Sequence, residues 1–112
     1  MENRFSTRYS RDQLPETIFT VLLVLPDKLQ IESQLVDISG QGLKLSIPPT
    51  PHPLSIPRKA ETAEVIFQAS HLRLTCRCIY SAYNPDGSML MGLHVFDPHQ
   101  QGQLRAFLEE CG

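Results

Sequence analysis

The fold is decided by residues 29–47, which read LQIESQLVDISGQGLKLSI. Apolar and polar side chains alternate in both halves of this stretch, the pattern of strands with one buried face. Its centre, Asp37-Ile38-Ser39-Gly40-Gln41-Gly42, is polar and rich in glycine, which predicts a tight turn. Two antiparallel strands joined by a glycine-rich turn are therefore expected here.

Most of the remaining sequence also indicates β-structure, with β-branched and apolar runs bounded by turn residues. The expected strands are Thr17–Leu25, Leu29–Val36, Leu43–Ile47, Glu61–Gln68, Leu72–Ala82 and Ser88–Phe96. The turn sequence Asn84-Pro85-Asp86-Gly87 predicts that the last two form a hairpin. Residues 48–57 contain five prolines, which exclude a ladder strand and predict an irregular connection.

The end of the chain changes to a helical period. Asp97 is suited to cap a helix, Pro98 suits its first position, and Gln100 completes a capping pattern. An apolar stripe follows at Leu104, Phe107, Leu108 and Cys111. The predicted fold is mainly β: a six-stranded antiparallel barrel, closed so that no strand edge stays exposed, with a C-terminal helix at about 98–110 over one mouth.

The bulk composition is that of a globular domain. The 112 residues are 41% hydrophobic and 20% charged, and no stretch approaches the roughly 20 apolar residues that span a bilayer. The first residues lack the apolar region of a secretion signal, so a cytoplasmic location without membrane insertion is expected. We expect a single barrel domain over residues 13–112, preceded by an arm.

The cysteines predict neither a disulfide framework nor a metal site. In the run Leu72, Leu74, Cys76, Cys78 and Tyr80, alternate positions share what is predicted to be an inward strand face. Small buried hydrophobic residues are the expected role of the two cysteines. His71 is an odd number of positions from both, so it lies on the opposite face, and no metal is predicted.

The charge of the chain is uneven. The net charge is −2, yet residues 1–11 contain Arg4, Arg8 and Arg11 against the single acid Glu2. With so little apolar content, residues 1–12 are expected to form a flexible arm. Guanidinium groups offer paired donors that suit phosphate oxygens and the O6/N7 edge of guanine, so a small anionic ligand is favoured over a long polyanion.

These features together resemble the PilZ domain, the bacterial receptor module for the second messenger cyclic di-GMP. The family has two nucleotide motifs, R-x-x-x-R before the first strand and [D/N]-x-S-x-x-G further on. The stretch Arg4-Phe5-Ser6-Thr7-Arg8 matches the first motif, and Asp37–Gly42 matches the second. Gly92–Pro98 also resembles the family's last strand and the start of its helix, so the resemblance extends over essentially the whole chain.

The resemblance implies a bacterial, cytoplasmic cyclic di-GMP receptor with no catalytic residue, no metal and no cofactor. Its ligand-binding residues would be Arg4, Arg8, Asp37, Ser39 and Gly42, with Gly40 and Arg11 as further candidates. The arginines would bind phosphates and guanine edges, Asp37 would accept guanine N–H hydrogen bonds, and Ser39 would donate or accept one more. Gly42, with Gly40 beside it, would let the turn adopt conformations closed to other residues and let the ligand approach the backbone.

A mechanism without chemical conversion follows from the resemblance. Ligand binding would order the arm on the barrel and present a new surface to a protein partner, in a monomer or weak dimer. The alternative is a protein–protein adaptor of the same fold that does not bind nucleotide. A single-strand nucleic-acid binder would need stacking aromatic residues in a basic groove, which the acidic remainder of the chain disfavours. An enzyme is least expected, since the histidines have no nucleophile or paired carboxylate at a telling spacing.

Overall fold

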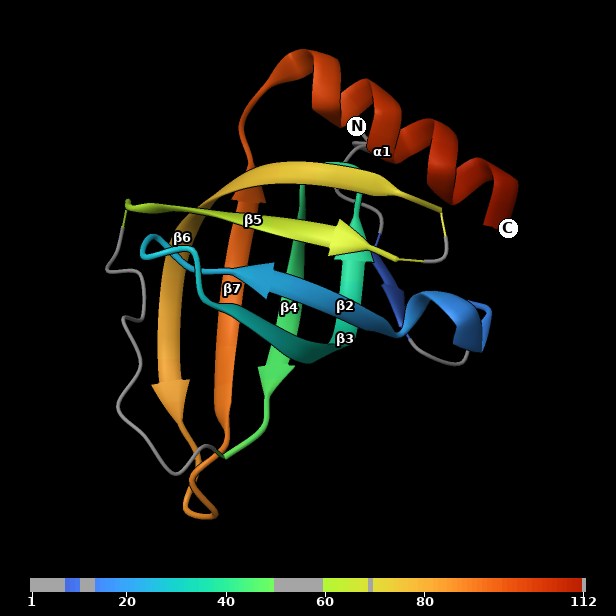
Figure 1. Ribbon diagram of the computed structural model, residues 1–112. Helices are drawn as coiled ribbons and strands as arrows, with labels where there is room; N and C mark the ends of the chain where they lie inside the picture. The colour runs from blue at the N-terminus through green and yellow to red at the C-terminus, as the bar shows by residue number, and fades with distance from the viewer. Residues whose placement is uncertain (1–7, 11–13, 50–59, 69, 112) are drawn as a thin grey trace, which may run out of the picture.

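The computed structural model describes residues 8–10, 14–49, 60–68 and 70–111. Within them, antiparallel strands form one sheet that closes into a barrel, and a helix lies across one end of the barrel (Figure 1). The elements are β1 (Arg8–Ser10), the 3-10 helix η3 (Glu16–Ile18), β2 (Thr20–Val24), β3 (Gln30–Ser39), β4 (Gly42–Ile47), β5 (Thr62–Phe67), β6 (Leu72–Tyr83), β7 (Met89–Val95) and α1 (Pro98–Cys111).

The barrel is a ring of six strands. Its order is β3-β2-β5-β6-β7-β4, and the ring closes because β3 also pairs with β4. The predicted six-stranded antiparallel barrel with a C-terminal helix is therefore confirmed. The short β1 is a seventh strand: β2 pairs with β3 over residues 30–34, and β1 pairs with the later part of the same strand, residues 37–39.

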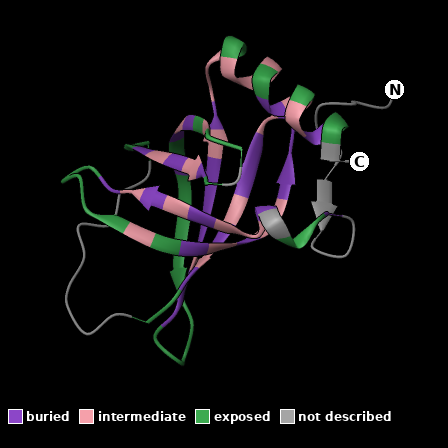
Figure 2. Cartoon of the chain, turned by 45° about the vertical axis from the view of Figure 1, so that its right-hand side comes forward, coloured by how far each residue is buried: buried purple, intermediate pink, exposed green. Residues whose placement is uncertain are grey.

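The inside of the barrel is one continuous hydrophobic core. Strand residues alternate between buried and partly exposed, and the buried ones line the interior (Figure 2). The thiols of Cys76 and Cys78 are among the buried groups, which confirms their predicted packing role. At one mouth, Leu104 and Leu108 of α1 are buried in the same core, and the Phe107 ring lies 5.2 Å from that of Phe67.

The start of α1 is fixed by side-chain hydrogen bonds. As predicted, Asp97 caps the helix: its Oδ1 accepts from the His99 N–H at 3.1 Å. Gln100, however, does not complete a capping pattern, because its Oε1 accepts from the backbone N–H of Thr75 on β6 at 2.7 Å. Gln101 also reaches away from the helix and donates to the Val95 carbonyl at 2.7 Å. These bonds attach the helix to β6 and β7.

No helix in the described part of the chain has the length and hydrophobicity needed to span a bilayer.

The expected strand over Thr17–Leu25 is shorter than predicted. Residues 16–18 form the 3-10 helix, and the strand begins at Thr20. The following strand is longer than predicted, since β3 continues through Ser39. The 3-10 helix buries Ile18, so this residue contributes to the core without strand geometry.

The inward face predicted for β6 is correct as far as Cys78 and then changes. Cys78 pairs with Leu93 and Tyr80 pairs with Gly92, so Ile79 is an extra residue that forms a β-bulge. Tyr80 was expected to face inward, but it is 40% exposed. The bulge shifts the strand by one residue and thereby turns Tyr80 to the outer face.

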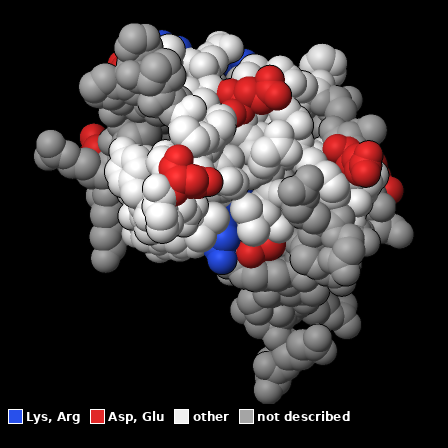
Figure 3. Space-filling model, turned by 90° about the horizontal axis from the view of Figure 1, so that it is seen from below, with Lys and Arg blue, Asp and Glu red and all other residues white. Residues whose placement is uncertain are grey.

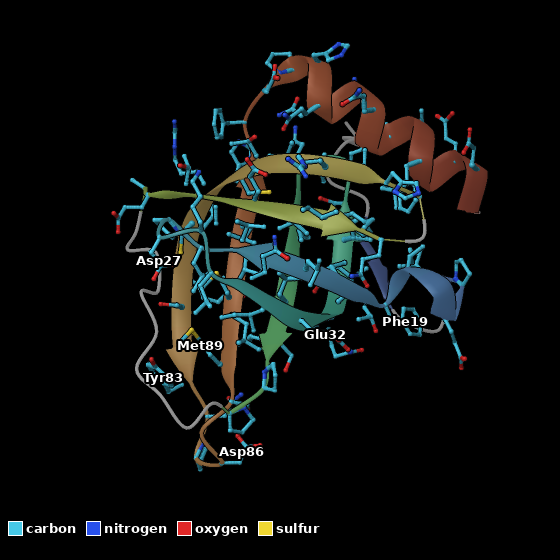
Figure 4. All side chains as sticks on the ribbon, in the orientation of Figure 1. Phe19, Asp27, Glu32, Tyr83, Asp86 and Met89 are labelled. Atoms are coloured by element: carbon cyan, nitrogen blue, oxygen red, sulfur yellow. The ribbon has the colours of Figure 1, made fainter. Side chains whose placement is uncertain are left out.

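The hairpin of β6 and β7 continues beyond the barrel. Asp86 lies at its tip and Tyr83 near the end of β6, pointing away from the core (Figure 4). The tip is fixed by Ser88, whose backbone N–H and hydroxyl both donate to Asp86 Oδ1, at 2.9 and 2.6 Å. These hydrogen bonds lower the pKa of Asp86, because they favour its charged form.

Candidate functional site

The second sequence motif spans the corner between β3 and β4. Asp37 and Ser39 lie in the last three residues of β3, and Gly42 is the first residue of β4. The expected turn is therefore limited to Gly40 and Gln41, and the carboxylate and hydroxyl come from a strand. A register shift between Leu35 and Asp37 precedes them. As residues two apart on one strand, Asp37 and Ser39 lie on the same face.

Ser39 holds this corner together. Its side chain is almost completely buried, with 3% of its surface exposed. The hydroxyl donates to the Gly42 carbonyl at 3.4 Å and accepts from the Gln41 N–H at 3.3 Å. The corner geometry thus depends on Ser39, in addition to any contact that its hydroxyl makes with a ligand.

Gly42 is required by the approach of β7. A Cβ at this position would lie 2.6 Å from the carbonyl oxygen of Leu93, which is backbone and has little freedom to move. The expectation that Gly42 adopts a conformation closed to other residues is wrong, because among the described glycines only Gly87 has a left-handed φ. Gly40 is buried in the connection.

Asp37 has a cationic neighbour on β4. The two residues are Cα partners across β3 and β4, and Lys44 Nζ lies 3.7 Å from Asp37 Oδ2. Both side chains remain partly accessible, at 33% for Lys44 and 19% for Asp37. The carboxylate is thus held at the surface beside a positive charge.

Arg8, the last residue of the first sequence motif, begins β1, which pairs with the end of β3 at the same corner. The Cα of Arg8 pairs with that of Ser39, and Ser10 pairs with Asp37. Residues separated by 31 and by 27 positions in sequence are thus cross-strand neighbours. Arg4 and Arg11 lie outside the described residues, as does the side chain of Arg8.

A surface pocket of about 220 Å³ opens next to this corner, on the outer face of the sheet. It extends from the end of β3 across β4 and β7 to β6. Its lining includes Ser39 and Gly42 of the motif together with residues that the sequence did not single out as site residues: Gln41, Leu43, Lys44, Ile79, Tyr80, Gly92, Leu93 and His94. Of the predicted residues that are described with their side chains, the structure brings two into the pocket wall.

The far side of the pocket is an aromatic surface. The Tyr80 ring lies on Gly92: a Cβ there would be 2.3 Å from ring atom Cε1 and 2.7 Å from Cδ1. The sequence contained one signal of this contact, because glycine inside a strand often marks a close approach. The outward position of Tyr80 could not be predicted from the alternation of β6, because without the bulge at Ile79 this residue would belong to the inner face.

The pocket lining therefore combines a buried hydroxyl, an ammonium group and a flat ring, and the Asp37 carboxylate lies beside the ammonium group. Such a set can bind a nucleobase and a phosphate, since rings stack on bases, carboxylates accept N–H groups and cations bind phosphate oxygens. In the described ranges, no group of three or more His, Cys, Asp or Glu side chains is arranged to hold a metal ion.

The charge distribution elsewhere differs from this site. On the face seen from below, acidic side chains stand in separate places and a basic one lies beside one of them (Figure 3). The described residues on this face do not form the continuous basic surface by which nucleic acid polymers are bound.

Comparison with known proteins identifies the family. Residues 4–110 match the PilZ domain. No curated protein sequence matches the chain. The chain is similar in fold to a solved structure, YcgR from Escherichia coli in complex with c-di-GMP, with 13% sequence identity and a TM-score of 0.59. The match covers 93% of this chain but only 43% of that protein. Because the PilZ match includes nearly every residue, both motifs and the barrel, the chain belongs to the PilZ domain family.

Proposed function

We propose that this chain is a receptor for cyclic di-GMP that transmits its signal through a protein partner. The observation that supports it best is the pairing of Arg8 with Ser39, because it joins the last residue of the arginine motif to a residue of the Asp37–Gly42 motif that lines the pocket. The ligand named for the structurally similar YcgR supports the same assignment.

In this proposal each part of the site has one task. Arg4 and Arg8 bind phosphate oxygens and the O6/N7 edge of guanine, and Arg11 is a further candidate. Asp37 accepts hydrogen bonds from guanine N–H groups, and Ser39 keeps the corner in shape. The exposed face of the Tyr80 ring stacks on a guanine base. Binding requires no bond making or breaking, so the chain acts as a receptor and not as an enzyme.

We also propose that ligand binding holds the arm, residues 1–12, against the barrel and so forms a surface for a partner. The pairing of β1 with β3 supports this, because the backbone of Arg8, the last residue of the arginine motif, lies next to Ser39. Contacts added by the ligand would fall on the Arg8 side chain and on residues before β1. The proposed setting is the bacterial cytoplasm, with the chain as a monomer or weak dimer.

The test is isothermal titration calorimetry with cyclic di-GMP, with GTP and cyclic di-AMP as controls. We expect selective binding that Arg4→Ala and Arg8→Ala each weaken about 5- to 150-fold, the equivalent of 1–3 kcal/mol. Hydrogen exchange of the peptide 1–12 should slow when the ligand is added. Unchanged affinity in both arginine variants would show that the motif is not the binding site.

The competing function is a PilZ-fold adaptor that binds a protein and no nucleotide. One observation favours it: three of the four large apolar side chains that are exposed among the described residues lie in the second half of β6, where Ile79 is 47% and Tyr83 73% exposed. A folded wild-type chain that gives no heat and no chemical-shift change with cyclic di-GMP would establish this alternative over the receptor.

A further inference from the structure

Lys44 lines the candidate pocket and lies on the strand between β3 and β7. On β4 its Cα pairs on one side with Asp37 of β3 and on the other with Gly92 of β7, over which the Tyr80 ring lies. Of the described residues that line the pocket, Lys44 is the only lysine or arginine. An ammonium group therefore stands between the carboxylate and the aromatic surface.

The ion pair of Lys44 with Asp37 is loose. The distance of 3.7 Å from Nζ to Oδ2 exceeds the 2.7–3.2 Å of a direct N–H···O hydrogen bond. One third of the Lys44 side chain is exposed, and ion pairs of this kind contribute little to stability. The ammonium group can therefore leave the carboxylate at small cost, and the four-carbon stem of lysine gives it the freedom to do so.

A carboxylate in a site for a doubly charged anion creates a conflict of charge. Without a counterion, Asp37 would repel the phosphates that the arginines attract. Lys44 offsets this charge in the free protein. Once guanine N–H groups donate to Asp37, the carboxylate is satisfied by the ligand, and the ammonium group is available to a phosphate oxygen.

We propose that Lys44 is a further ligand-binding residue: it pairs with Asp37 in the free site and with a phosphate of the dinucleotide in the complex. This inference rests on the proposed function and adds a cation from β4 to the two arginines of the N-terminal motif. Neither sequence motif includes it, because Lys44 lies two positions after Gly42, where it contributes only to the alternation of β4.

The test compares Lys44→Gln, Lys44→Arg and the control Lys28→Gln in titrations with cyclic di-GMP at several salt concentrations. Lys28 is exposed, lies in the turn between β2 and β3 and does not line this pocket. Its replacement by Gln therefore makes the same change in net charge as Lys44→Gln, but away from the site. Lys44→Gln should weaken binding about 5- to 20-fold and reduce the dependence of affinity on salt. Lys44→Arg should keep the affinity and its dependence on salt close to those of wild type. Lys28→Gln should change the affinity less than about twofold.

Three results would overturn the inference. Lys44→Gln with wild-type affinity and salt dependence would show that Lys44 does not contact the ligand. Weaker binding with unchanged salt dependence would assign it a structural role only. The third result comes from NMR titrations of Asp37→Asn with and without Lys44→Gln. Equal ligand affinity of these two proteins would show that Lys44 serves only as the counterion of Asp37. A folded wild-type chain that does not bind at all would overturn the proposed function itself, and this inference with it.

Discussion

The ring of Tyr80 lies on the backbone of Gly92, with ring atom Cε1 only 2.3 Å from the position a Cβ would take. Gly92 has no side chain, so the ring packs directly on the backbone of β7 between β4 and β6. The backbone of Gly92 covers one side of the ring, and 40% of the residue remains exposed. The pair thus offers a preformed stacking surface at the edge of the pocket.

Tyr80→Ala should weaken cyclic di-GMP binding about 5- to 150-fold, because stacking on an aromatic ring contributes about 1–3 kcal/mol per base. Tyr80→Phe keeps the ring and should bind like wild type. Calorimetry of the two variants separates the ring from the hydroxyl. Equal affinity for Ala and Phe would show that no base stacks on this residue.

Gly42→Ala and Gly92→Ala should differ in stability. At position 42 the added methyl group meets the Leu93 carbonyl, so we expect a loss of about 1–3 kcal/mol. At position 92 it meets the end of a flexible side chain, and Tyr80 can rotate away into solvent. Urea denaturation should therefore show a marked loss for Gly42→Ala and a small one for Gly92→Ala.

The contact between Tyr80 and Gly92 also leads to a prediction about ligand binding. Gly92→Ala should reduce ligand affinity although it leaves the barrel stable, since it displaces the Tyr80 ring. A Gly92→Ala protein that binds with full affinity would contradict the stacking role of Tyr80, and one as unstable as Gly42→Ala would contradict the flexibility of the ring.

Gln100→Ala should destabilise the fold by about 1–2 kcal/mol, because the N–H of Thr75 loses its acceptor. Gln100→Glu retains an acceptor oxygen and should restore most of this loss. The exposed Gln103→Ala is the matched control and should be close to neutral. Thermal unfolding of the three variants decides the matter: equal melting temperatures for Gln100→Ala and Gln103→Ala would mean that the contact does not hold the helix.

Cys76 should make stability fall at high pH. Burial raises the pKa of its thiol from 9.0 to about 12. In the unfolded chain the thiol ionises near its ordinary pKa, so this contribution to stability is complete below pH 9 and is lost as pH rises towards 12. Within this range the slope is up to about 1.4 kcal/mol per pH unit. The free energy of unfolding of Cys76→Ala should depend less on pH than that of wild type; identical slopes would refute the burial effect.

The fold was predictable from local signals to a large extent. The alternation over residues 43–47, the turn at 84–87 and the cap at Asp97 each act within a few neighbouring residues, and each predicts its element correctly. Barrel closure followed from the need to cover strand edges. The strand β1 was missed because three residues of low apolar content form a strand only through their pairing with β3.

The candidate site was predictable only in part. The motif residues Asp37, Ser39 and Gly42 are recognisable in sequence, but the positions of Lys44 and Tyr80 at the pocket depend on cross-strand register. A bulge is a property of two paired strands, so the single extra residue Ile79 could not be recognised in one of them. The reason for Gly42 was also non-local, since the obstructing carbonyl belongs to Leu93 on β7.

The closure of the ring has a consequence for the order in which the candidate pocket forms. The β3–β4 corner joins neighbouring segments, but β7, which supplies Gly92 and His94, pairs with β4 across more than 40 intervening residues. Contacts of such long range form slowly and late in folding. A nascent chain that has emerged only as far as residue 47 carries both motifs complete, yet it has no pocket. We therefore expect a growing chain to remain unresponsive to the second messenger until β7 has been synthesised and the barrel has closed.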